Sequence, residues 1–289
     1  MTAAEPQAHG RTDRHESFLA FESFRYLKLA ALVAVLSLLI YLVSEPYGGR
    51  YGGSWAGYVL GTVGALLILW LTWFGYRKRT YAEDHGRLAA RLSAHVYLGL
   101  ALLVTATLHT GFHFGWNIHT LAYALMVLVI VSGAFGVFFY ARYPRMMTGN
   151  RANMTMQQML GRIAILNDDL RSRALPLDDE TTALVEGAVE STEIGGSVLR
   201  QISGHYPNCK TAAAIAGMDA RMATVAPVME ADWRQIRVLL DEKAQLLGRV
   251  RRDISLKAVM DVWLYFHVPV TFALLAALLA HVVSVFFLW

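Results

Sequence analysis

Two apolar stretches of the sequence each carry a pair of histidines at the same spacing. His95 and His109 lie 14 residues apart, and His267 and His281 repeat that interval near the C-terminus. In an α-helix, this interval rises about 21 Å and returns the second side chain to within roughly 40° of the first. Each helix would therefore direct two imidazoles towards one neighbour, one near each side of a hydrocarbon core about 30 Å thick. Two such helices side by side would present facing imidazoles at two levels, and imidazole is an axial ligand of haem iron.

Histidines inside an apolar helix also have plainer explanations. Ionisable side chains in a membrane span are costly, so they usually face the bundle interior and mark an ion, proton or cofactor path. A single histidine would favour a simple hydrogen bond to a neighbouring helix, whereas four at a repeated interval favour a cofactor. Two other functions stay open: a histidine-lined path for a transition metal or protons, and a membrane sensor.

The composition of the chain is typical of a membrane protein. Of its 289 residues, 55% are hydrophobic and 17% are charged, and the mean hydropathy is +0.38. The basic residues flank hydrophobic segments or lie in a polar segment of balanced charge, so no nucleic-acid partner is expected. The single cysteine, Cys209, does not suffice for a disulfide, a CxxC metal set or covalent haem attachment. Any haem would therefore be non-covalent haem b, with its iron held by histidine.

Five segments are apolar and long enough to cross a bilayer, which predicts an all-α membrane protein. The first four spans lie within 19–142, behind a polar tail at 1–18 that is expected to be mobile, and the fifth lies within 258–289. The expected spans are 29–44, 55–76, 92–112, 119–141 and 262–286.

Residues 143–257 contain no crossing segment and are expected to form a helical cytoplasmic domain. The acidic run that starts at Asp178 is typical of a helix N-terminus. A continuous amphipathic helix is expected from Trp233 into the fifth span. The helices predicted for this domain are 153–173, 179–203 and 211–257, the last broken near Pro227.

The distribution of Lys and Arg predicts the orientation of the spans. These residues gather on one side of the membrane, and the opposite side has only Arg50. The positive-inside rule then places the N-terminus in the cytoplasm and the C-terminus in the periplasm, across a bacterial inner membrane. The third and fifth spans run in the same direction. His95 and His267 fall at the cytoplasmic level, and His109 and His281 at the outer level.

Four further residues could assist at these two levels. His113 comes four residues after His109 and is expected to share its helical face, and His119 opens the fourth span. Either could be a surface histidine, a replacement for His109, or a group that handles a proton or a quinone headgroup. Arg91 on the inner side and Arg50 on the outer side could pair with haem propionates, and interfacial anchoring explains them equally well.

The two histidine pairs, on parallel helices separated by one returning helix, resemble the di-haem core of b-type cytochromes. Cytochrome b of quinol-oxidising complexes and the ferric reductase-like transmembrane family share this plan, and the resemblance covers residues 55–142 and 258–286. It implies a four-helix core that holds two haem b groups, with His95 paired to His267 and His109 to His281. Gly61 and Gly75, also 14 residues apart, are similar to the haem-facing glycines of cytochrome b.

This resemblance also implies how the chain would act. The sequence has no Gly-rich dinucleotide fingerprint after a strand, which favours one electron-transfer subunit of a redox complex over a self-contained reductase. No catalytic residue is expected. The implied partners are membrane lipid, a quinone, a periplasmic c-type cytochrome or other redox subunit, and a cytoplasmic subunit docked on the helical domain.

Overall fold

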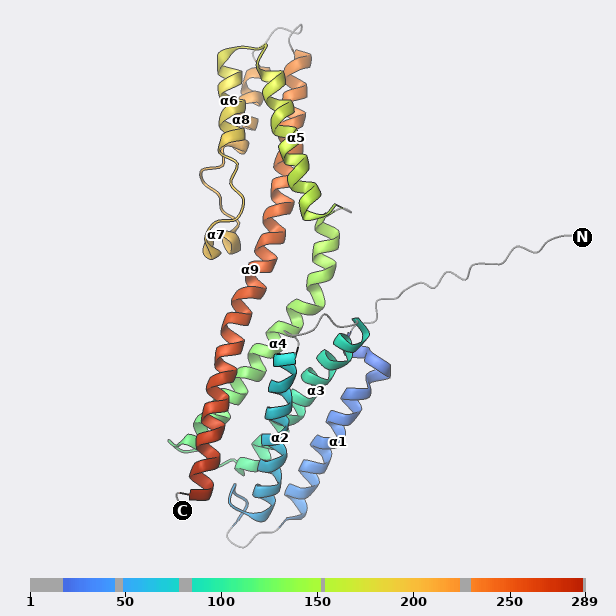
Figure 1. Ribbon diagram of the computed structural model, residues 1–289, viewed down its shortest axis with the longest axis vertical. Helices are drawn as coiled ribbons and strands as arrows, with labels where there is room; N and C mark the ends of the chain where they lie inside the picture. Colours follow the sequence, from blue (N-terminus) through green and yellow to red (C-terminus); the bar gives the residue numbers. More distant parts are fainter. Residues whose placement is uncertain (1–17, 45–48, 78–84, 152–153, 224–229, 288–289) are drawn as a thin grey trace, which may run out of the picture. The chain divides into compact units, whose positions relative to one another are not determined.

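The computed structural model describes residues 18–44, 49–77, 85–151, 154–223 and 230–287, which are almost entirely helical and include no strand (Figure 1). Most of the expected N-terminal tail and the expected break at Pro227 lie outside these ranges. The chain divides into two units. One unit comprises Met1–Val137 and Phe266–Trp289, and the other comprises Phe138–Tyr265.

The first unit is a bundle of membrane-spanning helices, and the prediction of five spans is confirmed. It begins with a short 3-10 helix, Phe18–Ala20, that leads into α1. The third span ends at Thr110, two residues earlier than expected, and the fifth is the apolar end of a much longer helix. The five helices are α1 (Phe21–Val43), α2 (Trp55–Arg77), α3 (His85–Thr110), α4 (Ile118–Arg151) and α9 (Glu230–Phe287).

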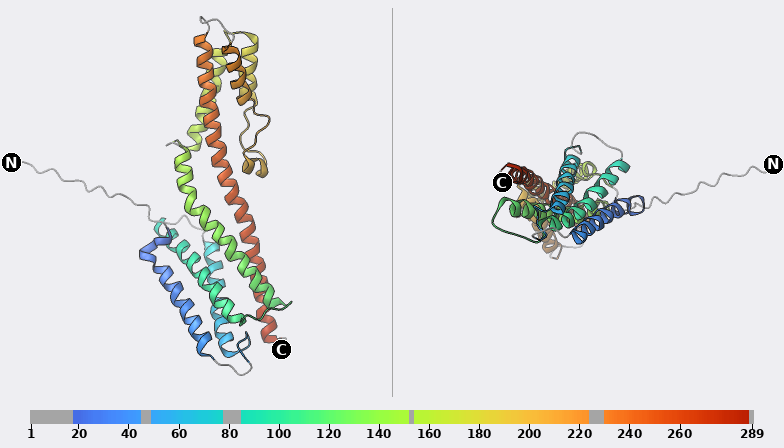
Figure 2. Two further views of the ribbon diagram at one scale, coloured as in Figure 1. Left: turned by 180° about the vertical axis from the view of Figure 1, so that it is seen from behind. Right: turned by 90° about the horizontal axis from the view of Figure 1, so that it is seen from below.

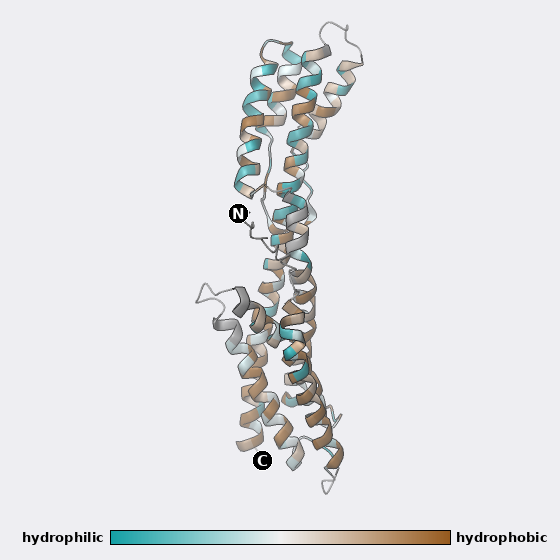
Figure 3. Ribbon diagram, turned by 90° about the vertical axis from the view of Figure 1, so that its right-hand side faces the viewer, coloured by the Kyte–Doolittle hydropathy of each residue, from teal (hydrophilic) through white to brown (hydrophobic). Residues whose placement is uncertain are grey.

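The outward surface of this unit is apolar, which is the reverse of a water-soluble bundle. Along α1, Leu32, Leu36 and Leu39 each leave about half of their surface exposed, and hydrophobic colour runs along these helices in Figure 3. An apolar surface of this extent would aggregate in water. These side chains therefore contact membrane lipid.

Helix α3 lies directly against α1 and α2 (Figure 2). Ser37 on α1 and Thr105 on α3 share a buried hydrogen bond of 2.9 Å, and Thr107 makes one of 2.9 Å with Tyr123 on α4. Such polar contacts join helices where apolar packing gains nothing over lipid contact. The buried apolar core draws on all five helices: Ala30, Ile68, Leu71, Leu98, Ala101, Leu102, Met126 and Leu274.

The second unit is a small helical bundle. It contains α5 (Met156–Ala174), α6 (Asp179–Glu190), α7 (Val198–Ser203), α8 (Thr211–Met222) and the first part of α9. Asp178 caps α6 by accepting a hydrogen bond from the Thr181 amide, and bonds from Thr181 hold the pKa of that carboxyl below its usual range. The core of this unit buries one residue from each of α5, α6, α8 and α9: Leu170, Val185, Met218 and Ile236.

The helices of this unit agree with the sequence predictions except at one place. The helix predicted over 179–203 is wrong, because it is interrupted between α6 and α7. Gly195 and Gly196 adopt φ values of +85° and +94°, a region that only glycine enters without strain. The predicted continuity into the fifth span is confirmed, since α9 runs unbroken through Pro269 to Phe287.

Candidate functional site

Three histidines from three helices converge at one end of the membrane unit. The rings of His109 on α3 and His281 on α9 have their centroids 6.0 Å apart, with planes at 84°. His119, in the first turn of α4, lies closer still, with its centroid 4.6 Å from that of His281. The Nδ1 atoms of His119 and His281 are 2.5 Å apart, so one donates a hydrogen bond to the other. We refer to His109, His119 and His281 as the outer cluster.

The orientation of His109 is set by the first turns of α2. Its Nδ1 lies 2.7 Å from the carbonyl oxygen of Gly57, so Nδ1 carries the proton and Nε2 has a free lone pair. Gly61, one turn further along, makes room for the ring, because a Cβ there would lie 2.7 Å from Cε1 of His109. The hydroxyl of Ser54 accepts a bond from the Gly57 amide and caps α2. Gly61 is thus in contact with an imidazole.

A comparable arrangement holds His267 at the other level of α9. Its Nδ1 lies 2.7 Å from the hydroxyl oxygen of Ser132 on α4, and the neighbouring Gly133 would bring a Cβ within 3.6 Å of its Cε1. His267 and His281 both belong to α9, and His95 and His109 both belong to α3. His95 is half-buried next to Ser93 and Ala94, which are almost fully buried.

The geometry of the outer cluster fits an iron porphyrin. Imidazole nitrogens bind transition metals at about 2 Å, which places the centroids of two opposed rings about 6 Å apart. His109 and His281 have that separation. Three of the four predicted ligands have Nδ1 within hydrogen-bonding distance of a neighbour, and this second contact is what normally orients a metal-binding histidine. The residues present therefore fit a haem whose iron would be held by these histidines.

A free metal ion would need a different arrangement. Within the described ranges, no three His, Cys, Asp or Glu side chains form a group that could hold a metal ion. A haem needs only two protein ligands, because the porphyrin supplies the other four. His109 and His281 supply that number of ligands.

The expectation for His113 is wrong in one respect, because His113 does not share the helical face of His109. Helix α3 ends at Thr110, and Gly111 and Phe112 adopt φ values of +57° and +61°, which turn the chain away. The exposed His113 ring instead lies 2.8 Å from the carbonyl oxygen of Gly111. It is therefore a loop residue outside the outer cluster.

The two predicted cations have different surroundings. Arg50 donates to the carbonyl oxygens of Ser44 and Leu42 at 3.2 and 3.0 Å, which satisfies the C-terminal end of α1. Its guanidinium also lies over the ring of Tyr41, 5.0 Å from the centroid. Arg91 is half-buried on α3, one turn before His95.

The second unit contains other polar groups that sequence reasoning did not connect. Lys243 is fully buried and donates to the carbonyl oxygen of Ala188 at 2.8 Å. Burial would raise the pKa of the Cys209 thiol, but hydrogen bonds from Thr211 and Arg251 lower it to about 7. The distance from Sγ of Cys209 to Oγ1 of Thr211 is 3.5 Å.

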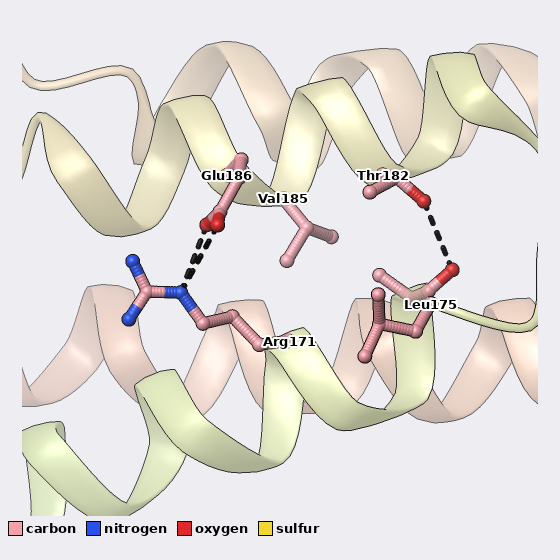
Figure 4. Close-up of a pocket in the computed structure, with 6 residues that line it drawn as sticks. Arg171, Leu175, Thr182, Val185 and Glu186 are labelled. Atoms are coloured by element: carbon pink, nitrogen blue, oxygen red, sulfur yellow. Dashed lines mark hydrogen bonds and ion pairs between the residues drawn. The ribbon is translucent and has the colours of Figure 1, made fainter.

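A small pocket of about 140 Å³ lies between α5 and α6 of this unit (Figure 4). Its walls include the ion pair of Arg171 with Glu186, at 2.9 Å, and a hydrogen bond of 3.0 Å from Thr182 to the Ala174 carbonyl. Both pairs tie α5 to α6, so these polar groups are occupied with one another.

Two residues of the candidate site were not predicted from the sequence, Gly57 and Ser132, which orient histidines. His119 was predicted as an accessory residue, and the structure places it in contact with His281. The GxxxG spacing of Gly57 and Gly61 was a signal for close helix contact.

Comparison with known protein families, curated proteins and solved structures gives no match.

Proposed function

We propose that this protein is the membrane subunit of an electron-transfer assembly and that it holds two b haems. His109 and His281 would be the axial ligands at the outer level, and His95 and His267 those at the inner level. Haem b supplies one-electron chemistry at iron, and two imidazole ligands leave no position for oxygen. The observation that carries the proposal is the 6.0 Å separation of the His109 and His281 rings.

The contacts around the proposed ligands orient their imidazole rings. Gly57 fixes the tautomer of His109, and Ser132 restrains the ring of His267, so each Nε2 is pre-oriented. His119 is a positioning residue, since it touches His281 through Nδ1. The apolar core around Leu98, Leu102 and Leu274 excludes water between the two levels.

The direction across the membrane follows from the charges. With Lys and Arg concentrated on one side, the N-terminus would lie in the cytoplasm and the C-terminus in the periplasm of a bacterial inner membrane. Electrons would cross between a quinone or cytoplasmic donor and a periplasmic redox protein such as a c-type cytochrome, or in the reverse direction. The polar helical domain would dock a cytoplasmic subunit.

Absorption spectroscopy of the purified chain tests this proposal. We expect sharp b-type bands in the reduced-minus-oxidised spectrum and two haems per chain in the pyridine haemochrome assay. His281→Ala should reduce this to one haem. His113→Ala is the matched control and should retain two, because His113 lies in the loop beyond α3. A purified, folded protein without haem bands would refute the proposal, and retention of both haems by His281→Ala would refute the ligand assignment.

A further inference from the structure

Helix α7 exposes a group of apolar side chains. Val198, Leu199 and Ile202 leave 53%, 79% and 39% of their surfaces exposed. They lie at i, i+1 and i+4, which is one side of a helix. Single exposed apolar residues are ordinary, whereas three within a six-residue helix indicate a surface that is covered by something.

The position of α7 along α9 is fixed by hydrogen bonds inside the second unit. Arg251 donates twice to the carbonyl oxygen of Glu193, at 3.2 and 2.8 Å. Ser255, one turn further along α9, donates to the carbonyl oxygen of Ile202 at 3.4 Å. The chain from Glu193 to Ile202 therefore runs in the direction of α9 towards its apolar part, and Figure 1 shows α7 beyond the ends of α6 and α8.

The apolar part of α9 begins a short distance from this contact. Val262 is seven residues after Ser255, which is about 10 Å along the helix axis. Val262, Leu264 and Tyr265 leave 43%, 43% and 80% of their surfaces exposed, as expected where a helix enters lipid. The headgroup region outside the hydrocarbon core is about 5–8 Å thick on each side, so the Ser255 contact lies near its outer edge. The apolar face of α7 is thus within about two helical turns of the first lipid-facing residues of α9.

The exposed charges between the two apolar surfaces have a basic excess of one. Between the Arg251 contact and Val262, α9 exposes two basic side chains, Arg252 and Lys257, and one acidic side chain, Asp261; Asp253 is buried. Basic side chains at this level are attracted to anionic lipids, and amphipathic helices lie in the interface with their apolar face towards the acyl chains. Gly195, Gly196 and Gly204 bound α7 with positive φ values and set it apart from α6 and α8.

We propose that α7 is an interfacial anchor that inserts Val198, Leu199 and Ile202 into the boundary between headgroups and acyl chains of an anionic membrane. This assignment does not depend on haem. It gives the second unit its own attachment to the membrane, in addition to the two helices that connect it to the spans.

Site-directed spin labelling of the full chain tests the proposal. In a Cys209→Ser background, Leu199→Cys and Val238→Cys would be labelled and reconstituted in bilayers of phosphatidylcholine and phosphatidylglycerol. Val238 is the control, because it is also exposed, at 59%, but lies much earlier on α9. We expect the ratio of collisions with oxygen to collisions with a water-soluble nickel chelate to be several-fold higher at 199 than at 238. Ile202→Cys provides a second position on the same face.

Two outcomes would overturn the anchor. A label at 199 as accessible to the nickel chelate as the label at 238 would place α7 in water. A label at 199 shielded from both reagents would show that protein, rather than lipid, covers this face. Circular dichroism of each labelled chain verifies that the helical content is unchanged.

Discussion

His109 on α3 and His281 on α9 lie with their ring centroids 6.0 Å apart, although they are far apart in the sequence. Nδ1 of His109 donates a hydrogen bond to the Gly57 carbonyl, and Nδ1 of His281 is hydrogen-bonded to His119. Each ring therefore has its Nδ1 engaged by the protein, and the Gly57 contact leaves Nε2 of His109 available.

Gly61→Ala should disturb the outer site. The added Cβ would lie 2.7 Å from Cε1 of His109, so the imidazole must move, at a cost of about 1–3 kcal/mol for overpacking. The expected result is loss of most of the outer haem, measured as a fall from two haems per chain towards one. Gly64→Ala is the control, since its Cβ would meet only a Leu102 methyl group at 3.8 Å. Equal haem content in both variants would contradict the role of Gly61.

Ser132→Ala should weaken the inner site without abolishing it. The variant removes the hydroxyl that lies 2.7 Å from Nδ1 of His267, and loss of such a contact typically costs about 10–100-fold in metal-site affinity. The measurement is haem retention on dilution, together with a redox titration in which only one of two midpoints should shift. Thr62→Ala is the control, because that exposed hydroxyl bonds only to the Tyr58 carbonyl of its own helix. Identical midpoints in Ser132→Ala and the unmodified chain would argue against this contact.

Cys209 should react with iodoacetamide at neutral pH. Its pKa of about 7 lies below that of a free thiol, about 8.5. The thiolate is the reactive form, so the alkylation rate should rise with pH and reach half its plateau near pH 7. Arg251→Gln removes one of the groups that lower this pKa and should move the midpoint to higher pH. Alkylation quenched at a series of times and quantified by mass spectrometry gives the rate against pH for the unmodified chain and for Arg251→Gln. A midpoint above pH 8 in both proteins would be evidence against these contacts.

Lys243 should tolerate replacement by a side chain of similar size but not by a small one. It is fully buried, and the Ala188 carbonyl that it binds also accepts a bond from Thr192. Lys243→Met fills the space and removes a buried ammonium group, and the Thr192 hydroxyl, shared with the Val189 carbonyl, still reaches the Ala188 carbonyl, so stability should be unchanged or higher. Lys243→Ala leaves a cavity and should lower the free energy of unfolding by about 2–4 kcal/mol. Thermal unfolding followed by circular dichroism compares the two, and equal melting temperatures would contradict the packing role.

The sequence by itself determined the class of the protein, its five spans and the long helix that ends the chain. These properties depend on local hydropathy, helix propensity and the fixed thickness of a bilayer. The start of α6 at its N-cap, Asp178, also depends on neighbouring residues in the sequence and was predicted from them. The break at Gly195 and Gly196 was missed, since glycine permits a positive φ without requiring it.

Only the tertiary structure decided which side chains meet. Helix α3 ends at Thr110, which removes His113 from the face of His109, and the first turn of α4 brings His119 against His281. The Gly57 carbonyl and the Ser132 hydroxyl became partners of histidines in the same way. Contacts of this kind depend on where each helix ends and how it is rotated about its axis. Those quantities are set by packing between helices distant in the sequence, so the local pattern of residues does not contain them.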